Sequence, residues 1–370
     1  MMERRELIEN LARNALKESL HLKKGQNVIV ETYPHGLEFA TEFIYQARAL
    51  GARAILIYED EATLFRTAST LDASKAMKVG SHEWAALAKT NAYVFFPGPA
   101  DIGKIREIGV EKWGKVYPDN EEWYKRAKKS GVRGVRILLG YASKERASSY
   151  GLDHEAWQEM LLRAGTVPPK SVRKTAGAVA ARLKKGKEVR ITAPNGTDLK
   201  FRLAGRAPQS DTGSVEPQDL KSKDGESNFT TLPAGQVWVA PDEKSAEGSV
   251  VFDRPSPYLG RWVRGIEYEF RGGRLAAHSV GENPELFEKP FEKAKGDKDR
   301  LGMLILGVNP EVRTGFLQDA MSAGAIQLTL GANGNLGGKN KTGFYFGATL
   351  TGGTLTVDGK TVIDAGRLSP

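Results

Sequence analysis

The chain of 370 residues contains no cysteine, only five histidines and no long apolar run. Without cysteine it can form neither disulfide bonds nor thiolate metal sites, and a cysteine nucleophile is excluded. No stretch approaches the roughly 18 consecutive apolar residues that a membrane-spanning helix requires. The start of the chain, MMERRELIENL, has charges on both sides of its apolar positions, which is typical of an amphipathic helix and not of a secretory signal. The composition therefore predicts a cytoplasmic protein with no membrane partner.

The chain has an excess of positive charge, but its basic residues are interspersed with acidic ones along the sequence. The formal net charge is +9, with 54 Lys and Arg against 45 Asp and Glu. Proteins that bind nucleic acids concentrate positive charge on one face. One basic cluster, residues 170–190, has apolar residues at helical spacing, so its basic side chains are expected on the solvated face of a packed helix. The apolar residues of this helix are Val172, Ala176, Val179 and Leu183. We therefore predict no nucleic-acid partner.

The first half of the chain alternates strand and helix patterns. NVIVET (27–32) and ARAILIYED (52–60) are short β-branched runs, and the segment between them has helical spacing and ends at Gly51. A strand, a helix and a strand in about 35 residues form a parallel βαβ unit. The pattern predicts a doubly wound α/β domain over residues 1–185. Further strands are expected at 91–98 and 134–141, and helices from Asp119, at 153–165 and at 171–184.

From residue 186 the pattern changes to many short alternating strands separated by turn-forming residues. Helical character is expected only at 285–301 and after Pro310. Residues 207–229 are polar and rich in turn formers, which predicts a long loop. The second half, residues 186–370, is therefore expected to be a β-rich α+β domain.

The second half contains the motifs APNGTDLKFRLAGR, LPAGQVWVAPDEKSAEGSVVFD, LGMLILGVNP, GAIQLTLGANGNLGGKNKTG and LTVDGKTVIDAG. On these motifs, which occur together in a characteristic order, the chain resembles the aminopeptidase T and aminopeptidase S family of dinuclear metallopeptidases. The resemblance runs from about residue 5 to residue 367. It implies an N-terminal α/β domain, a C-terminal β-rich domain, a homodimer and a site for two divalent cations that polarise the scissile carbonyl and acidify a bridging water.

The positions at which the resemblance places metal ligands carry other residues. The family's two Glu ligands fall at Gln236 and Met303, its first His at Gln327, and its His-x-Asp at Tyr345 and Gly347. A neutral amide is a weak ligand for a hard cation, a thioether is soft, and glycine offers no side chain. We therefore expect a divergent member without the cation pair and without another cofactor. Residues that the resemblance places around the site, in a supporting role, are Asp319, Asn333, Asn340 and Thr342.

Two interpretations of these positions stay open. The substitutes fill the former metal cavity with hydrogen bonds, or they bind a small-molecule or short-peptide ligand, with Tyr345 as hydrogen-bond donor or acid. The favoured function is an aminopeptidase-like protein that binds, or acts on, a peptide-like or amide-bearing molecule without a metal.

Two further functions are alternatives. An authentic metal-dependent aminopeptidase would need relocated ligands, and a ring-cleaving dioxygenase would need His and Asp at the same substituted positions. His278, in a strand pattern, and His35, in a turn after the first strand, are expected to be a structural and a surface residue. The acids nearest to the substituted positions are Asp242, Glu243, Glu247 and Asp319.

Overall fold

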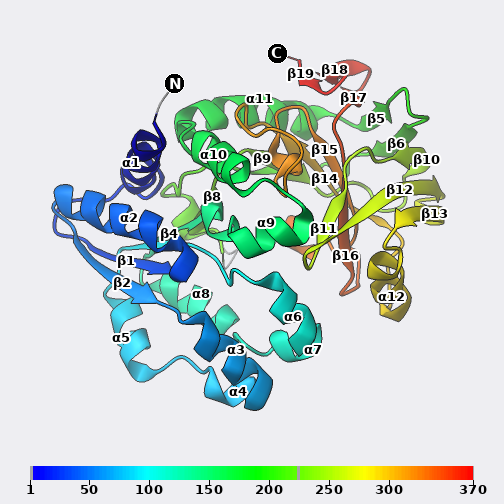
Figure 1. Cartoon of the computed structure of the whole chain (residues 1–370). Coiled ribbons are helices and arrows are strands. Elements are labelled where there is room, and N and C mark those ends of the chain that lie inside the picture. Colours follow the sequence, from blue (N-terminus) through cyan, green and yellow to red (C-terminus); the bar gives the residue numbers. More distant parts are fainter. Residues whose placement is uncertain (1–2, 223–225, 370) are drawn as a thin grey trace. The chain divides into compact units, whose positions relative to one another are not determined.

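The computed structural model describes residues 3–222 and 226–369, which divide into two compact units (Figure 1). Unit 1 comprises Met1–Pro169 and Gly213–Ala234, and unit 2 comprises Lys170–Thr212 and Gly235–Pro370. Among the described residues, no helix is both long enough and apolar enough to cross a membrane.

This division differs from the expected boundary at residue 185 in two segments. Helix α11 (Pro169–Lys185) belongs almost entirely to unit 2, and residues 213–234 return to unit 1. The return occurs because β8 (Phe229–Leu232) pairs in parallel with β4 (Arg133–Ile137). Pairing between strands so distant in the chain leaves no local pattern in the sequence.

Unit 1 is built on a parallel five-stranded sheet in the order β2-β1-β3-β4-β8, which confirms the expected α/β class. Its first strands are β1 (Asn27–Thr32), β2 (Arg53–Tyr58) and β3 (Ala92–Phe95). Helix α2 (Leu37–Ala49) packs on β1 and β2 (Figure 1). Helices α5 (Ser81–Ala88) and α8 (Asn120–Lys129) contribute Leu87 and Ala127 to the core around Ile29 and Tyr93. Chain order reverses between β1 and β3, where open α/β sheets bind ligands.

The other elements of unit 1 surround this sheet. Strand β4 ends at Ile137, earlier than predicted, because the chain turns into a 3-10 helix. There a side chain at Gly140 would lie 2.6 Å from the Pro97 nitrogen. The helices are α1 (Arg4–Asn14), a π-helix (Ala15–Ser19), α2 (Leu37–Ala49), α3 (Glu61–Thr70), α4 (Ala73–Ala76), α5 (Ser81–Ala88), α6 (Ile102–Ile108), α7 (Val110–Trp113), α8 (Asn120–Lys129), α9 (Lys144–Tyr150) and α10 (His154–Gly165), with 3-10 turns η2 (Pro34–Gly36), η3 (Leu138–Tyr141) and η4 (Asp219–Lys221).

Unit 2 contains two antiparallel sheets, as expected for a β-rich domain. The five-stranded sheet has the order β16-β15-β14-β9-β7. Its strands are β7 (Gln209–Asp211), β9 (Gln236–Val239), β14 (Leu301–Gly307), β15 (Ile326–Gly331) and β16 (Tyr345–Leu350). The larger sheet has the order β11-β12-β10-β6-β5-β17-β18-β19, with β13 paired to β12. Its strands are β5 (Glu188–Thr192), β6 (Asp198–Arg202), β10 (Glu247–Val251), β11 (Ser256–Tyr258), β12 (Arg261–Arg271), β13 (Arg274–Glu282), β17 (Thr354–Val357), β18 (Lys360–Asp364) and β19 (Arg367–Leu368).

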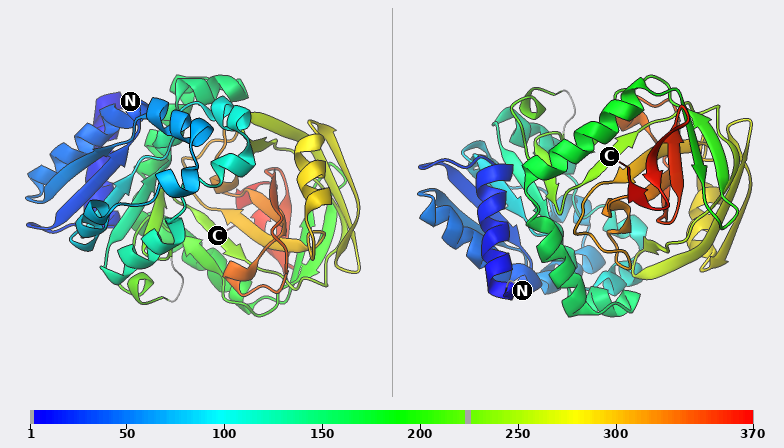
Figure 2. Two further views of the ribbon diagram at one scale, coloured as in Figure 1. Left: turned by 90° about the horizontal axis from the view of Figure 1, so that it is seen from below. Right: turned by 90° about the horizontal axis from the view of Figure 1, so that it is seen from above.

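The helices of unit 2 match the expectations in part. In α11 the four predicted apolar positions are buried, which confirms a helix with one packed face. Helix α12 (Glu285–Lys293) lies beside β12 and β13 (Figure 2), where Phe287 contacts the rings of Tyr268 and His278.

Two expectations for unit 2 and its flanking loop are corrected by the structure. The prediction of a helix after Pro310 is wrong, because only a 3-10 turn, η5 (Asp319–Met321), forms in this stretch. Gly315 has a φ of 111°, which is not a helical backbone conformation. Within the expected loop 207–229, β7, η4 and the first residue of β8 form instead, and residues 223–225 lie outside the described part of the chain.

Candidate functional site

The five substituted positions lie on one face of the smaller sheet of unit 2. Strand register aligns Trp238 with Ile305, Ile305 with Gln327, and Gln327 with Thr349 across four adjacent strands. Aligned residues on neighbouring strands share a face, and so do alternate residues along a strand. By this rule the face also contains the residues that lie two or four positions from Trp238, Ile305 or Thr349 along the same strands. The face, called here the β9–β16 face, therefore carries Gln236, Met303, Gln327, Tyr345 and Gly347.

Gln327 and Gln236 are half-buried on this face and make only long side-chain hydrogen bonds. Nε2 of Gln327 donates to the Thr349 hydroxyl at 3.3 Å, and Nε2 of Gln236 donates to the Ala320 carbonyl at 3.4 Å. Within the described residues, the Oε1 atoms of both glutamines accept no hydrogen bond. A side chain at Gly347 would begin 3.2 Å from Cδ and Nε2 of Gln327, so these two positions are neighbours. The face thus presents two amide carbonyl acceptors.

Met303 and Tyr345 differ in what they contribute. Met303 is buried and packs with Ala240, Ile305 and Leu336, so it fills space. Tyr345 is 52% exposed, and removal of its hydroxyl from part of the surrounding water raises the pKa of the phenol. Its hydroxyl therefore keeps its proton at neutral pH and can donate a hydrogen bond.

Asp319 is buried beside this face and already has its own cation. Nε of Arg254 donates to one carboxylate oxygen at 2.7 Å. The amides of Gly315 and Phe316 donate to the other oxygen at 2.7 and 3.0 Å. The carboxylate is thus neutralised by a guanidinium and needs no metal. Arg254 was missed by sequence reasoning, since its partner lies 65 positions further along the chain.

Replacing Arg254 by Met is expected to lower the free energy of unfolding by about 2 kcal/mol, because it leaves a buried carboxylate without its cation. Urea unfolding at pH 7 measures this. The matched control is Arg261→Met, which breaks an ion pair to Glu285 whose side chains are 42% and 39% exposed. Such an exposed pair contributes less than about 1 kcal/mol. Equal losses in the two variants would show that Arg254 does not stabilise Asp319.

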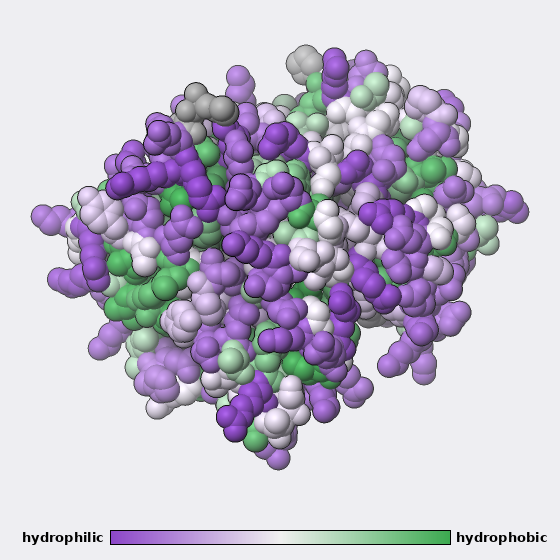
Figure 3. All heavy atoms as spheres, viewed as in Figure 1, coloured by the Kyte–Doolittle hydropathy of each residue, from purple (hydrophilic) through white to green (hydrophobic). Residues whose placement is uncertain are grey.

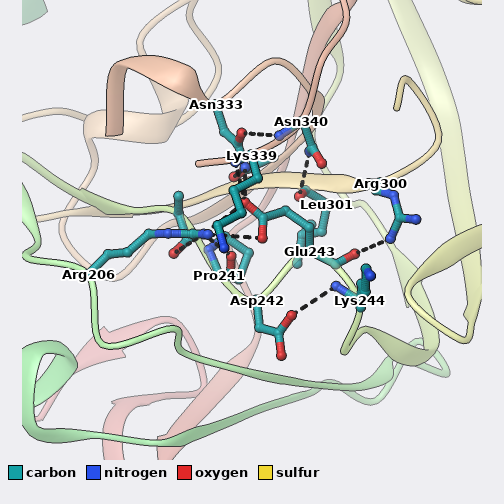
Figure 4. Close-up of polar contacts among 12 residues, drawn as sticks. Arg206, Pro241, Asp242, Glu243, Lys244, Arg300, Leu301, Asn333, Lys339 and Asn340 are labelled. Atoms are coloured by element: carbon teal, nitrogen blue, oxygen red, sulfur yellow. Dashed lines mark hydrogen bonds and ion pairs between the residues drawn. The ribbon is translucent and has the colours of Figure 1, made fainter. Parts of the chain in front are cut away.

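Glu243 organises the segment that precedes β16 (Figure 4). Its carboxylate accepts hydrogen bonds from Arg206 at 2.9 and 3.0 Å, from the Lys339 amide at 2.6 Å and from Asn333 Nδ2 at 3.2 Å. Oδ1 of Asn333 in turn accepts the amide of Asn340 at 3.0 Å. Burial acts to raise the pKa of Glu243, but the bonds from Arg206 and Lys339 outweigh it and hold the pKa below its usual range. Glu243 is therefore an ionised structural residue.

The predicted supporting residues are also structural. Nδ2 of Asn340 donates to the carbonyls of Leu301 and Gly331 at 3.2 and 2.7 Å, which ties the segment to β14 and β15. The hydroxyl of Thr342 accepts the amide of Phe344 at 3.1 Å. Asn333, Asn340 and Thr342 thus fix the approach to Tyr345 and Gly347.

The cation pair that the resemblance implies does not fit the residues present. The β9–β16 face offers no carboxylate or imidazole at the five positions, and divalent cations need such donors. The remaining acids have other partners: Asp242 pairs with Arg202 at 2.9 Å, and Glu247 accepts the Gly272 amide at 2.6 Å. Within residues 3–222 and 226–369 no group of three or more His, Asp and Glu is arranged to hold a metal ion. His278 packs on Phe287, with ring centres 5.1 Å apart.

In unit 1, a groove of about 880 Å³ opens beside His35, whose side chain is only 15% exposed. The expected surface position of His35 is therefore wrong. Its Nε2 lies 2.5 Å from the Gly140 carbonyl, and its Nδ1 lies 3.2 Å from a Glu61 oxygen that also accepts the Ala100 amide. Both ring nitrogens thus lie within hydrogen-bond distance of an oxygen acceptor. These residues follow β1, β2, β3 and β4, and the histidine ties the four strand ends together.

Comparison with known proteins agrees with this architecture. A family model described as thermophilic metalloprotease (M29) matches residues 4–310. The chain belongs to the M29 family. The match includes Gln236 and Met303 and ends before Gln327, Tyr345 and Gly347. The chain is thus a divergent M29 member that lacks the metal-ligand residues expected at the five substituted positions.

Two solved structures share the fold. Wild-type AmpT from Thermus thermophilus aligns with a TM-score of 0.74 and 22% identity, over 99% of this chain and 100% of that one. The 2,5-dihydroxypyridine dioxygenase from Pseudomonas putida KT2440 aligns with a TM-score of 0.64 and 16% identity, over 100% and 98% of the two chains. A comparison with curated protein sequences gave no match. At these identities the structural likeness concerns the fold alone.

Proposed function

We propose that this M29 protein binds a small, uncharged, amide-bearing ligand, such as a short peptide-like molecule, on the β9–β16 face without a metal ion. The observation that carries the proposal is the pair of half-buried glutamines whose carbonyl oxygens accept no hydrogen bond within the described residues. An amide ligand offers one N–H donor and one carbonyl acceptor, and a glutamine side chain complements both. The exposed Tyr345 hydroxyl supplies a further donor for the ligand carbonyl.

Charge supports an uncharged ligand over a free amino terminus. In the metal-dependent reaction, cations balance the charges of their ligands and of the bound substrate. Here the five positions are neutral, and the nearby Asp319 is already paired with Arg254. An ionic group brought to this face would lose water without gaining a partner, which costs several kcal/mol.

Binding measurements on the full chain in the presence of EDTA test the proposal. A blocked dipeptide amide is expected to raise the melting temperature, because a ligand that binds the native state stabilises it by mass action. Gln327→Ala and Gln236→Ala should each weaken binding about tenfold, as expected for the loss of one or two hydrogen bonds. The matched control is Gln218→Ala, an exposed glutamine of unit 1, which should leave binding unchanged.

Other outcomes decide against the proposal. Two divalent cations per chain that remain after purification, together with EDTA-sensitive hydrolysis of leucine p-nitroanilide, would establish a metal-dependent aminopeptidase with relocated ligands. Equal binding by the wild type and both glutamine variants would place any ligand elsewhere on the molecule.

A further inference from the structure

Arg254 adds a cationic side chain to the β9–β16 face. It forms an antiparallel bridge with Thr349, and its amide donates to the Thr349 carbonyl at 3.2 Å. Residues paired in this way have their side chains on the same side of the sheet. Arg254 therefore continues, beyond β16, the row of aligned residues that contains Gln327 and Thr349. Its ion pair with Asp319 belongs to the face on which the five substituted positions lie.

The ion pair between Arg254 and Asp319 is largely buried. Hydrophilic residues cover most of the side of the molecule that Figure 3 shows, whereas these two side chains are only 25% and 7% exposed. One oxygen of the acid accepts Nε of Arg254 at 2.7 Å, and the other accepts the amides of Gly315 and Phe316. Because both oxygens have partners, the carboxylate is fixed in place and holds the guanidinium in one orientation.

Most N–H donors of the Arg254 guanidinium remain available. A guanidinium has N–H donors on all three nitrogens, and within the described residues only Nε makes a hydrogen bond. Nη1 and Nη2 have no acceptor there. A side chain at Gly315 would begin 3.8 Å from Nη2, so the glycine leaves this nitrogen uncovered. The charge of Arg254 is thus balanced by Asp319, while its outer donors are unused.

The same network reaches both glutamines of the face. Ala320, in η5, accepts Nε2 of Gln236 at 3.4 Å, and Thr349 accepts Nε2 of Gln327 at 3.3 Å. These two acceptors flank the ion pair, because one follows Asp319 in the chain and the other is the bridge partner of the arginine. The face therefore combines unused N–H donors with the two unused amide carbonyl oxygens, and an amide ligand complements both.

We propose that Arg254 binds the carbonyl oxygen of the ligand through Nη1 and Nη2, while a glutamine carbonyl oxygen accepts the ligand N–H. This inference rests on the proposed binding of an amide on the β9–β16 face. The cation pair implied by the family resemblance polarises the substrate carbonyl. Here a guanidinium donates to the same kind of oxygen.

The balanced charge of this guanidinium predicts which ligands it selects. A neutral carbonyl gains hydrogen bonds from Nη1 and Nη2 and brings no charge to the face. A free carboxylate would meet a cation that Asp319 already neutralises, and it would be repelled by that acid. The site is therefore expected to select an amide over the corresponding acid.

Calorimetric titration of the full chain in EDTA with N-acetyl-dialanine amide and with the corresponding free acid tests the role of Arg254. The wild type is expected to bind the amide roughly tenfold more tightly than the acid. Arg254→Lys keeps a cation for Asp319 but loses the planar fork of donors, so it should weaken amide binding roughly tenfold. The matched control is Arg261→Lys, at the exposed pair with Glu285, which should bind like the wild type. Circular dichroism confirms that each variant is folded.

A second variant tests the charge balance. Asp319→Asn keeps Arg254 but removes the acid that neutralises it, so this variant should bind the free acid more tightly than the amide. An arginine that only stabilises the fold would not reverse the preference. Amide binding by Arg254→Lys equal to that of the wild type, or an Asp319→Asn variant that still prefers the amide, would overturn the role of Arg254 and leave amide binding by the glutamines standing. A wild type that does not bind the amide would overturn the proposed function as well.

Discussion

Restoring the family's ligand types at the five substituted positions is expected to convert this chain into a protein that binds divalent cations. The combined variant is Gln236→Glu, Met303→Glu, Gln327→His, Tyr345→His and Gly347→Asp. Because the five positions share one face of adjacent strands, the new carboxylates and imidazoles would lie on the same side of the sheet. Metal analysis after dialysis against zinc or cobalt should show stoichiometric uptake, with at least micromolar affinity by calorimetry.

The stability of the same variant gives an independent readout. Without metal it should be less stable than the wild type, because Met303→Glu buries a carboxylate at a position only 8% exposed. Metal should then raise its melting temperature strongly by mass action. The matched control replaces the same residues by neutral ones: Gln236→Asn, Met303→Leu, Gln327→Asn, Tyr345→Phe and Gly347→Ala. A folded ligand variant that takes up no more metal than this control would show that these positions do not correspond to the ligands of the family.

Replacing Glu31 by Gln is expected to stabilise the protein at pH 8 and to have little effect at pH 4. Burial of the carboxyl group raises the pKa of Glu31 to about 7; the hydrogen bond from the Tyr93 hydroxyl opposes this, and Glu59 and Glu83 add to it. The unfolded chain has the ordinary pKa of about 4.5. The stability associated with the protonated group is therefore complete below pH 4.5 and is lost as the pH rises through 7.

The separation between the two pKa values corresponds to at most roughly 3 kcal/mol. Since Glu31 keeps some surface in contact with water, we expect a gain of about 2 kcal/mol from Glu31→Gln at pH 8. Gln keeps a carbonyl acceptor for Tyr93. Urea unfolding at pH 4, 6 and 8 measures the effect. Glu267→Gln, at an exposed position of β12, should change stability by less than about 0.5 kcal/mol at every pH. If Glu31→Gln raised the free energy of unfolding equally at every pH, the raised pKa of Glu31 would not be the cause.

Local patterns predicted the elements of this fold better than its connections. The run 27–32 is β1 as expected, because a short β-branched segment between turns has few other structures open to it. The helical expectation for 285–301 holds only as far as Lys293, where α12 ends. The strand 301–307 is buried along its whole length, and a continuous apolar run lacks the alternation by which a half-exposed strand is recognised in a sequence.

The site shows the same division between local and distant information. Family motifs supplied the five positions, and strand register places them on one face. The partners that neutralise the remaining acids, Arg254 for Asp319 and Arg206 for Glu243, could not be predicted. Each ion pair joins residues tens of positions apart, and an isolated arginine in a sequence does not indicate its acid. The same limit applies to His35, whose two acceptors, Glu61 and Gly140, follow two other strands.

The late position of β8 in the chain has a consequence for synthesis on the ribosome. The sheet of unit 1 lacks its fifth strand until residue 232 has been made, and by then β5 and β6 of unit 2 have already been translated. A nascent chain that stops at residue 169 would leave the backbone N–H and C=O groups on one side of β4 unpaired. Such an open sheet edge is prone to pair with other nascent chains. Neither half of this protein can therefore be isolated by cutting the gene at a single point.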